Sequence, residues 1–329
     1  MSAAAYSHSS IERLDLLTRI ESAVARSLHV VLVGAPGTGK TALLKQWCER
    51  DLHRVEHHQA VGRHVPVFVP VKLQKLDTVL GFWTDLWEGV RRQANLPGRY
   101  ADGDVPVMEK VRFSRLTPPA QTIEKALKSL QHASPSLGPI VPVIDVGSEL
   151  SHDDLRSIVL EIRALFDASV WTGALFGNRA SAALFSEFEF IAMTALEDND
   201  VVHALRMSGL DQDSISEAVH AISGIPCLLD CFLNGRDESV TERRMQWMRE
   251  VAVYLQAWKG LPERILTFLA RHHEPQSWIR IVNTFGDPYD LRLAMMHLEG
   301  SLLVSRVIFK DVMCWMIRTP DLVPEDRRS

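Results

Sequence analysis

The residues with the clearest chemistry lie at positions 34 to 41, where the sequence reads GAPGTGKT. This segment fits the pattern G-x-x-x-x-G-K-[ST], in which glycines allow a tight turn whose backbone N–H groups face phosphate oxygens. The lysine of the pattern, Lys40, reaches the β- and γ-phosphates, and the hydroxyl of Thr41 ligates Mg²⁺. The predicted phosphate-binding residues are Gly34, Ala35, Pro36, Gly37, Thr38, Gly39, Lys40, Thr41 and Ala42. The segment therefore predicts a nucleotide-binding loop.

The residues on either side of the loop give it the expected structural context. His29 to Val33 is a short apolar run typical of a strand buried on both faces, and Ala42 to Trp47 continues as a helix. A phosphate in this loop would lie at the helix N-terminus, where the helix dipole and free N–H groups favour an anion.

A nucleotide-binding loop also needs an acidic group at the end of a neighbouring strand, to hold Mg²⁺ through its water shell. Asp145 follows the apolar run Ile140 to Ile144 and is the candidate. Enzymes that hydrolyse the nucleotide usually place a second carboxylate directly afterwards, to orient or deprotonate the attacking water. Val146 stands there and can do neither, whereas Glu149 lies four residues beyond Asp145 and could substitute.

A third candidate for contact with the phosphates is Arg179, in the segment Gly177-Asn178-Arg179 at the end of a predicted fourth strand. Ligands of parallel α/β sheets bind at the carboxyl ends of the strands, and a guanidinium there could sense a γ-phosphate. A solvated arginine in a turn fits the same pattern equally well. The predicted catalytic set is therefore Asp145, Glu149 and Arg179.

The elements that must position these residues follow from hydrophobic patterning over 329 residues, 46% of them hydrophobic. Strands alternate with amphipathic helices up to about residue 196, which predicts an α/β domain with a parallel sheet and helices on both faces. The predicted strands are 29–33, 65–71, 140–150, 169–176 and 188–196, and the predicted helices are 11–25, 42–47, 78–94, 120–133 and 153–166. From Glu197 onward the pattern is almost entirely helical, and 95–119 is predicted to be a loop insertion.

Several of these segments together resemble the STAND class of P-loop NTPases, the signal-transducing relatives of AAA+ proteins that include the archaeal-type ATPases. Arg13 in IERLDLL resembles the arginine that opens such domains, and LFGNR resembles their strand ending in an arginine sensor. AISGIPCLLD resembles their helical-lid motif, in which a Gly-x-Pro turn, here Gly224 and Pro226, places the proline against adenine. Lys310 in IFKDVMCWMI stands where a phosphate-reading histidine is usual.

The resemblance implies three domains: a P-loop α/β domain over 1–196, an α-helical lid over 197–255, and a C-terminal winged-helix domain with a tail over 256–329. It implies ATP or ADP and Mg²⁺ as cofactors, with Thr41 and Asp145 on the metal side and Pro226 on the base. Three helices, 261–270, 278–284 and 291–298, and a following hairpin in SLLVSRVIFK are the predicted winged helix.

These features favour a molecular switch that binds ATP or ADP, with slow or no hydrolysis, and that controls assembly of copies of itself or a separately encoded effector protein. The alternative is a DNA-associated AAA+ regulator of transposition or replication that uses its winged helix on DNA. A net charge of −5 counts against nucleic acid as the main partner. A third possibility is a scaffold that stays bound to its nucleotide without turnover. The absence of an apolar run of transmembrane length predicts a cytoplasmic protein.

Overall fold

The computed structural model of the chain describes residues 11–56, 65–71, 78–94, 119–137, 140–146, 153, 156–158, 160, 175–177, 189–234, 239–256, 260–272 and 274–318. These residues fall into two compact units. The first comprises Met1–Arg13, Val33–Ala42 and Ile191–Ser329, and the second comprises Leu14–Leu32 and Leu43–Phe190. The segment Val33–Ala42, which holds the predicted phosphate-binding loop, is thus grouped with the C-terminal elements.

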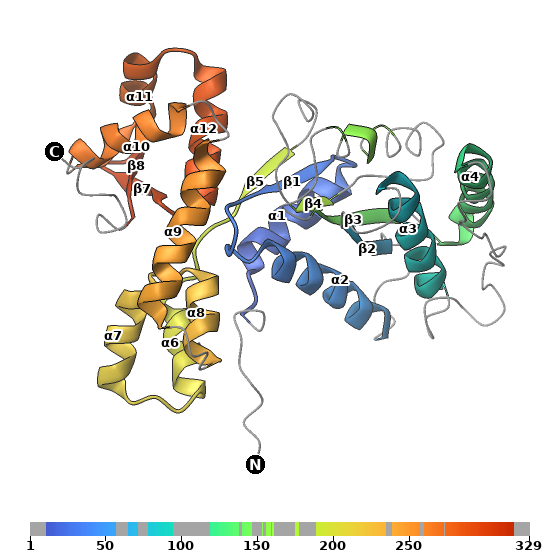
Figure 1. Cartoon of the computed structure of the whole chain (residues 1–329), viewed down its shortest axis with the longest axis horizontal. Coiled ribbons are helices and arrows are strands. Elements are labelled where there is room, and N and C mark those ends of the chain that lie inside the picture. Colours follow the sequence, from blue (N-terminus) through green and yellow to red (C-terminus); the bar gives the residue numbers. More distant parts are fainter. Residues whose placement is uncertain are drawn as a thin grey trace. The chain divides into compact units, whose positions relative to one another are not determined.

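The second unit contains most of a five-stranded sheet with the strand order β2-β3-β4-β1-β5 (Figure 1). Its strands are β1 (Val30–Val33), β2 (Val65–Val71), β3 (Ile140–Val146), β4 (Leu175–Gly177) and β5 (Glu189–Ala192). The pairs β2–β3, β3–β4 and β4–β1 are parallel. The four residues of β1 are valines and a leucine, all buried, as expected of a strand covered on both faces.

Four helices accompany this sheet: α1 (Leu14–Ala25), α2 (Lys40–Glu56), α3 (Thr78–Ala94) and α4 (Pro119–Leu137). Helix α3 packs against β2 and α4, and its two tryptophans, Trp83 and Trp87, are completely or almost completely buried. The small parallel sheet agrees with the predicted α/β class. The predicted loop insertion at 95–119 and most of the helix predicted at 153–166 lie outside the described residues.

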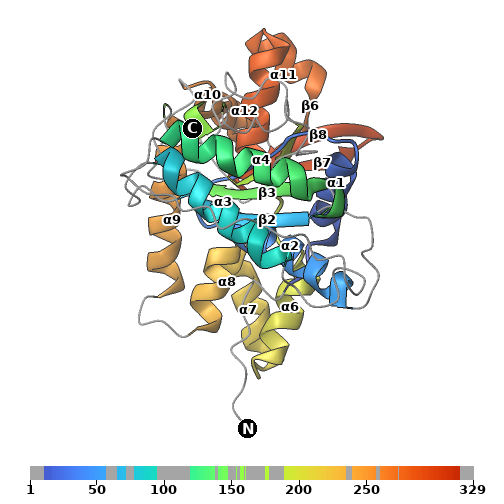
Figure 2. The ribbon, with the colours of Figure 1, turned by 90° about the vertical axis from the view of Figure 1, so that its right-hand side faces the viewer.

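From residue 198 onward, the described part of the first unit consists of helices and one small sheet. Its helices are α6 (Asp198–Met207), α7 (Gln212–Ile222), α8 (Pro226–Leu233), α9 (Val240–Gln256), α10 (Leu261–Arg271), α11 (Trp278–Phe285) and α12 (Pro288–Gly300). The small sheet has the order β6-β8-β7, with antiparallel strands β6 (Gln276–Ser277), β7 (Val304–Phe309) and β8 (Val312–Ile317). Figures 1 and 2 show α9 running from the group α6–α8 to the group α10–α12.

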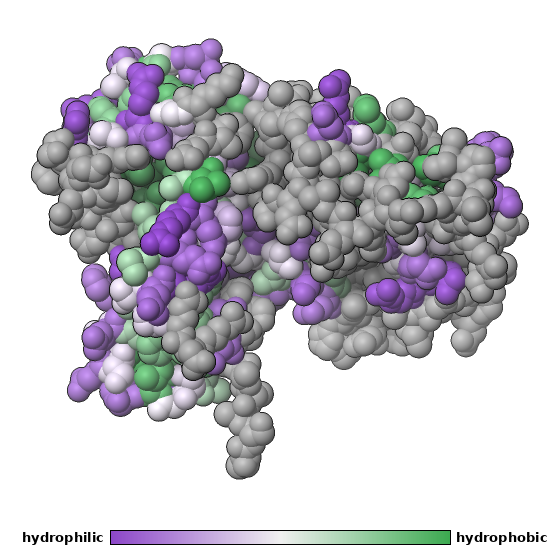
Figure 3. All heavy atoms as spheres, viewed as in Figure 1, coloured by the Kyte–Doolittle hydropathy of each residue, from purple (hydrophilic) through white to green (hydrophobic). Residues whose placement is uncertain are grey.

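Helix α9 joins the two helical groups through a continuous core. Trp247, Val251, Tyr254 and Leu255 of α9 are all buried and belong to one hydrophobic cluster with residues of α6–α8 and α10–α12. On the face shown in Figure 3 the described surface is mainly hydrophilic, with hydrophobic residues in small patches. None of the described helices is both long and apolar enough to span a membrane.

A tight turn between α7 and α8 fixes where α8 begins. Ser223 and Gly224 have positive φ angles of 51° and 65°, and the Gly224 carbonyl accepts a hydrogen bond of 2.9 Å from the Leu196 amide. A Cβ atom on Gly224 would lie 2.5 Å from the Leu196 carbonyl oxygen, which is closer than real side chains come. This turn therefore requires glycine both for its backbone angle and for space.

We predict that Gly224→Ala destabilises the chain by about 1–3 kcal/mol more than Gly209→Ala, the cost of forcing a methyl group into occupied space. Gly209 is the matched control because its φ is also positive, 89°, while its Cβ position meets nothing within 4 Å. Chemical denaturation of both variants measures the difference. Equal stability losses would show that the space around Gly224 adjusts without cost.

Candidate nucleotide-binding site

The predicted phosphate-binding loop lies between the end of β1 at Val33 and the start of α2 at Lys40. Gly37 and Gly39 have positive φ angles of 78° and 86°, so the tight turn expected from the sequence is present. Thr38 is fully buried, and its hydroxyl donates a 2.8 Å hydrogen bond to the Ala35 carbonyl within the same loop. The loop is therefore an ordered turn that leads directly into a helix N-terminus.

Three successive carbonyl groups of the loop accept hydrogen bonds from three different parts of the chain. The indole Nε1 of Trp247, on α9, donates to the Pro36 carbonyl at 3.1 Å. The Cys227 amide, in the first turn of α8, donates to Gly37 at 3.2 Å. The Arg13 guanidinium donates to Thr38 at 3.2 Å.

These bonds set the direction of the amides that follow. In a planar trans peptide the C=O of one residue and the N–H of the next point in opposite directions. Holding the carbonyls of residues 36, 37 and 38 therefore turns the N–H groups of Gly37, Thr38 and Gly39 to the other side of the loop. Among the described residues these three amides donate no hydrogen bond, so together they are suited to hold an anion.

Two buried cations accompany the amides. Lys40 is 8% exposed, and its Nζ donates to the carbonyls of Gly34 and Ala35, both at 2.8 Å. Arg13 is also 8% exposed and donates to the carbonyl and the hydroxyl of Thr194 as well as to the loop. Both cations lie at the loop, where their positive charge would favour a phosphate group.

The end of α12 packs directly on the start of the loop. The Gly300 carbonyl accepts a 3.1 Å hydrogen bond from the Ala35 amide. A Cβ atom on Gly300 would lie 2.4 Å from the Val33 carbonyl oxygen, so only glycine allows this approach. One turn earlier on α12, the buried His297 ring nitrogen Nδ1 shares a hydrogen bond with the hydroxyl of Tyr254 on α9.

Pro226, predicted to lie against adenine, is the first residue of α8 and is buried. It is close to the loop: a Cβ atom on Gly39 would lie 3.5 Å from Pro226 Cγ. A proline suits a helix start because it has no N–H to leave unpaired there. The turn at Gly224 thus brings the proline beside the phosphate-binding loop, and its contact with a base stays a prediction.

The residues predicted to assist the phosphates are described only in part. Asp145 lies in β3 and is half-buried; it is in register with Gly177 of β4, which is in register with Leu32 of β1. Thr41, in the first turn of α2, is exposed. Glu149 and Arg179 lie outside the described residues. The metal-binding and catalytic assignments of these residues therefore stay predictions.

Sequence reasoning missed the residues that support the loop. Trp247 is fully buried on α9 and bonds to Pro36, which is 211 positions away in the sequence. A buried indole N–H usually has a partner, and this was the available signal. Gly300 gave a weaker signal, a glycine that ends an otherwise regular helix.

Lys310, which stands where the resembled family usually has a histidine, lies in the β7–β8 turn. Its side chain is exposed and its ammonium group lies over the Phe309 ring.

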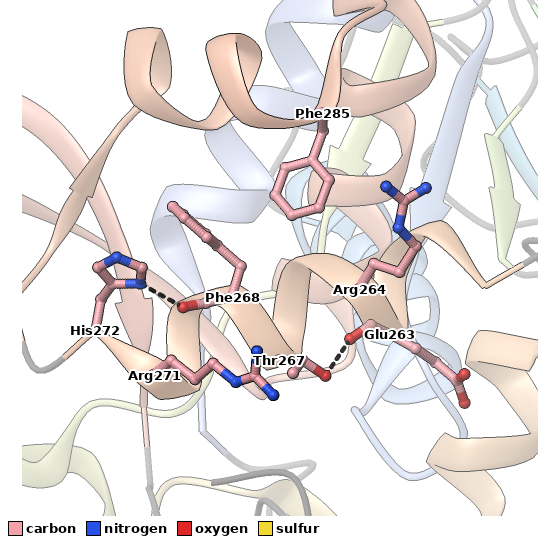
Figure 4. A pocket seen from close by; sticks show the side chains of 7 residues that line it. All are labelled: Glu263, Arg264, Thr267, Phe268, Arg271, His272 and Phe285. Carbon is pink, nitrogen blue, oxygen red and sulfur yellow. Dashed lines mark hydrogen bonds between the residues drawn. The ribbon is translucent and has the colours of Figure 1, made fainter. Parts of the chain in front are cut away.

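A separate open hollow of about 620 Å³ lies on α10 and α11 (Figure 4). It is lined by Glu263, Arg264, Thr267, Phe268, Arg271, His272 and Phe285, none of which belongs to the loop. The Phe268 ring packs edge-on against Phe285, and His272 bonds the Phe268 carbonyl, so its aromatic lining is already engaged within the chain. In the part of the chain that the structure describes, no group of His, Cys, Asp and Glu is arranged to hold a metal ion.

The chain matches no protein-family model, and no curated protein matches it significantly. Solved structures with a similar arrangement include a STAND protein with a tetratricopeptide repeat sensor from Pyrococcus horikoshii, at 13% identity and a TM-score of 0.42, over 96% of this chain and 42% of that one. The Orc1 protein of Aeropyrum pernix, solved in complex with DNA, has 14% identity and a TM-score of 0.45 over 96% and 92%. Cdc6p of Pyrobaculum aerophilum has 14% identity and a TM-score of 0.43 over 98% and 95%.

These neighbours are STAND and AAA+ ATPases, the class that the sequence motifs resemble. The chain spans less than half of the STAND protein's length. Identities of 14% or less and TM-scores below 0.5 carry no conclusion about function, which must come from the residues of this chain.

We predict that His297 makes the folded chain sensitive to acid. Burial lowers the pKa of His297 from 6.5 to about 3. Between these values the unfolded chain binds a proton that the folded chain does not, so stability is lost as the pH falls from about 6.5 towards 3. Replacing the histidine with glutamine should remove this contribution.

Denaturant unfolding at pH 7 and pH 4 measures the effect. The wild-type chain should lose about 3 kcal/mol more between these pH values than His297→Gln does. His220→Gln, which removes an exposed histidine on α7, is the control and should behave as wild type. An equal loss in wild type and His297→Gln would contradict the prediction.

Proposed function

We propose that this protein is a switch of the STAND and AAA+ type that binds ATP or ADP with Mg²⁺. The observation that carries the proposal is the set of three adjacent amides of Gly37, Thr38 and Gly39, which donate no hydrogen bond to any described residue and lie in the same loop as the buried cation Lys40, with Arg13 bonded to it. Adjacent N–H donors at a helix N-terminus fit phosphate oxygens.

The loop residues 34–42 would hold the phosphates, with Lys40 supplying positive charge, while Thr41 and Asp145 would serve the Mg²⁺ ion. When bound, the γ-phosphate of ATP supplies the charge whose presence or loss distinguishes two states of the protein. Pro226 would pack against the adenine base. Its position beside Gly39 supports a role close to the nucleotide.

We infer that α6–α9 form the lid and that α10–α12 with β6–β8 form a winged helix, in line with the three proposed domains. Helix α12, which would read DNA in a DNA-binding winged helix, is buried along most of its length, and its only exposed basic residue is Arg292. Its end is hydrogen-bonded to Ala35 instead. These observations favour a winged helix that closes on the loop over the DNA-associated regulator.

Hydrolysis in this proposal is slow or absent, because Val146 stands where a water-orienting carboxylate is usual. Glu149 is the residue that would take that part if turnover occurs. The output of the switch would be assembly of several copies, or release of a surface for a separate effector protein in the cytoplasm. A scaffold locked on its nucleotide differs from this proposal only in that ADP and ATP would leave it in the same form.

The central test of nucleotide binding is Lys40→Ala. The variant should bind ATP more weakly by on the order of 2–3 kcal/mol, the scale of a charged hydrogen bond left unmade. Lys45→Ala, which removes an exposed lysine of the same helix, should bind ATP as wild type does. Isothermal titration calorimetry measures both. An unchanged affinity in Lys40→Ala would refute the assignment of the loop.

The test of the switch compares ADP with a non-hydrolysable ATP analogue by light scattering. We expect ADP to stabilise a closed monomer and the ATP analogue to favour an open or assembled form. A ligand shifts such an equilibrium only by its differential affinity for the two states. Arg179→Ala should therefore bind ADP nearly normally but lose the difference between the two nucleotides. One unvarying size and shape of the wild type with both would contradict the switch.

A further inference from the structure

We propose that helix α9 positions the phosphate-binding amides through the indole of Trp247, so that the placement of α9 sets the affinity for phosphate groups. Trp247 is a positioning residue here, since its contact is with the loop backbone and not with the ligand. The proposal rests on nucleotide binding by the loop, and it adds the element that regulates that binding.

The indole can act in this way because it is fixed. Trp247 is fully buried in the core cluster of its unit, and its Nε1 is 3.1 Å from the Pro36 carbonyl oxygen. The Pro36 carbonyl shares its peptide plane with the Gly37 amide. Rotation of that plane would turn the amide away from the phosphate side and leave the indole N–H unpaired in the core, which is unfavourable for a buried donor.

Helix α9 is itself tied to the other element that holds the loop. Its Tyr254 hydroxyl is hydrogen-bonded to His297 of α12, and the α12 carbonyl of Gly300 accepts from the Ala35 amide. Helix α12 therefore holds the Ala35 amide, and α9 holds the carbonyl of the next residue, Pro36. A displacement of α9 relative to α12 would have to break the Tyr254–His297 bond or move the loop.

A change in the position of α9 therefore changes the orientation of the loop amides as well. With α9 in place, the Gly37 amide is oriented before any ligand arrives, which lowers the cost of ordering the loop on binding. By linkage, a phosphate group bound to the loop stabilises this placement of α9 to the same extent. Binding at the loop and the state of the helical groups at both ends of α9 are coupled in this way.

The experiment compares Trp247→Phe with Trp87→Phe. Phenylalanine keeps an aromatic ring at position 247 but removes the N–H donor that Pro36 uses, together with part of the ring volume. Trp87→Phe removes the same atoms from another buried tryptophan and so controls for the lost volume. Trp87, on α3, is equally buried, but its Nε1 has no hydrogen-bond partner in the described part of the chain. Affinities for ADP, inorganic pyrophosphate and adenosine are measured by calorimetry, with circular dichroism to check folding.

Trp247→Phe should bind ADP and pyrophosphate about 3- to 10-fold more weakly than Trp87→Phe does, which corresponds to the loss of one hydrogen bond. Adenosine, which lacks phosphate, should bind both variants equally. A general loss of structure would lower the affinity for adenosine as well, so the comparison separates positioning from packing.

Tyr254→Phe provides a second variant that leaves both the loop and Trp247 intact. It removes the hydroxyl that joins α9 to α12 and should weaken ADP binding about 2- to 5-fold, and it decides the question if Trp247→Phe does not fold. The proposal is overturned if the folded variants at positions 247 and 254 bind ADP as tightly as Trp87→Phe. If the wild-type chain itself binds neither ADP nor pyrophosphate, the failure lies with nucleotide binding and not with positioning.

Discussion

The structure of the site depends on the orientation of three peptide planes. An amide that faces an anion turns the carbonyl of the same peptide plane to the opposite side, where a buried carbonyl needs a donor. Here the carbonyls of Pro36, Gly37 and Thr38 are satisfied by α9, α8 and Arg13 respectively. The strongly polar backbone of the loop thus has its acceptors paired within the protein and its donors turned outward. The helical elements of the unit therefore complete the loop's hydrogen bonding as well as packing beside it.

This arrangement explains why the loop groups with the C-terminal elements of the chain. Its neighbours Pro226, Trp247 and Gly300 come from three different helices. Gly300 brings the α12 backbone against Val33, where any side chain would collide. Close backbone contact of this kind fixes two elements to within a few tenths of an ångström, which is the tolerance that oriented hydrogen-bond donors need.

The local elements could be predicted from the sequence, and the contacts between distant elements could not. The apolar run at β1, the glycines of the loop and the helix after Lys40 are local features with strong signals, and β2 and α3 have the predicted bounds. The bonds of Trp247, Cys227 and Gly300 involve backbone groups, which carry no signature in the sequence. A buried indole N–H is expected to have a hydrogen-bond acceptor. Which group accepts, here the Pro36 carbonyl, depends on the tertiary structure.

The sequence separations of these contacts bear on how the protein is made. Trp247 lies 211 positions after Pro36, and Gly300 lies near the end of the described chain. A ribosome releases the N-terminal segment long before either residue exists, and contacts between distant positions form late because closing long loops is entropically costly. The peptide planes of the nascent loop therefore lack these partners until Trp247 and Gly300 have emerged from the ribosome. Competence for phosphate groups would then depend on the synthesis of α9 and α12, which are made long after the loop itself.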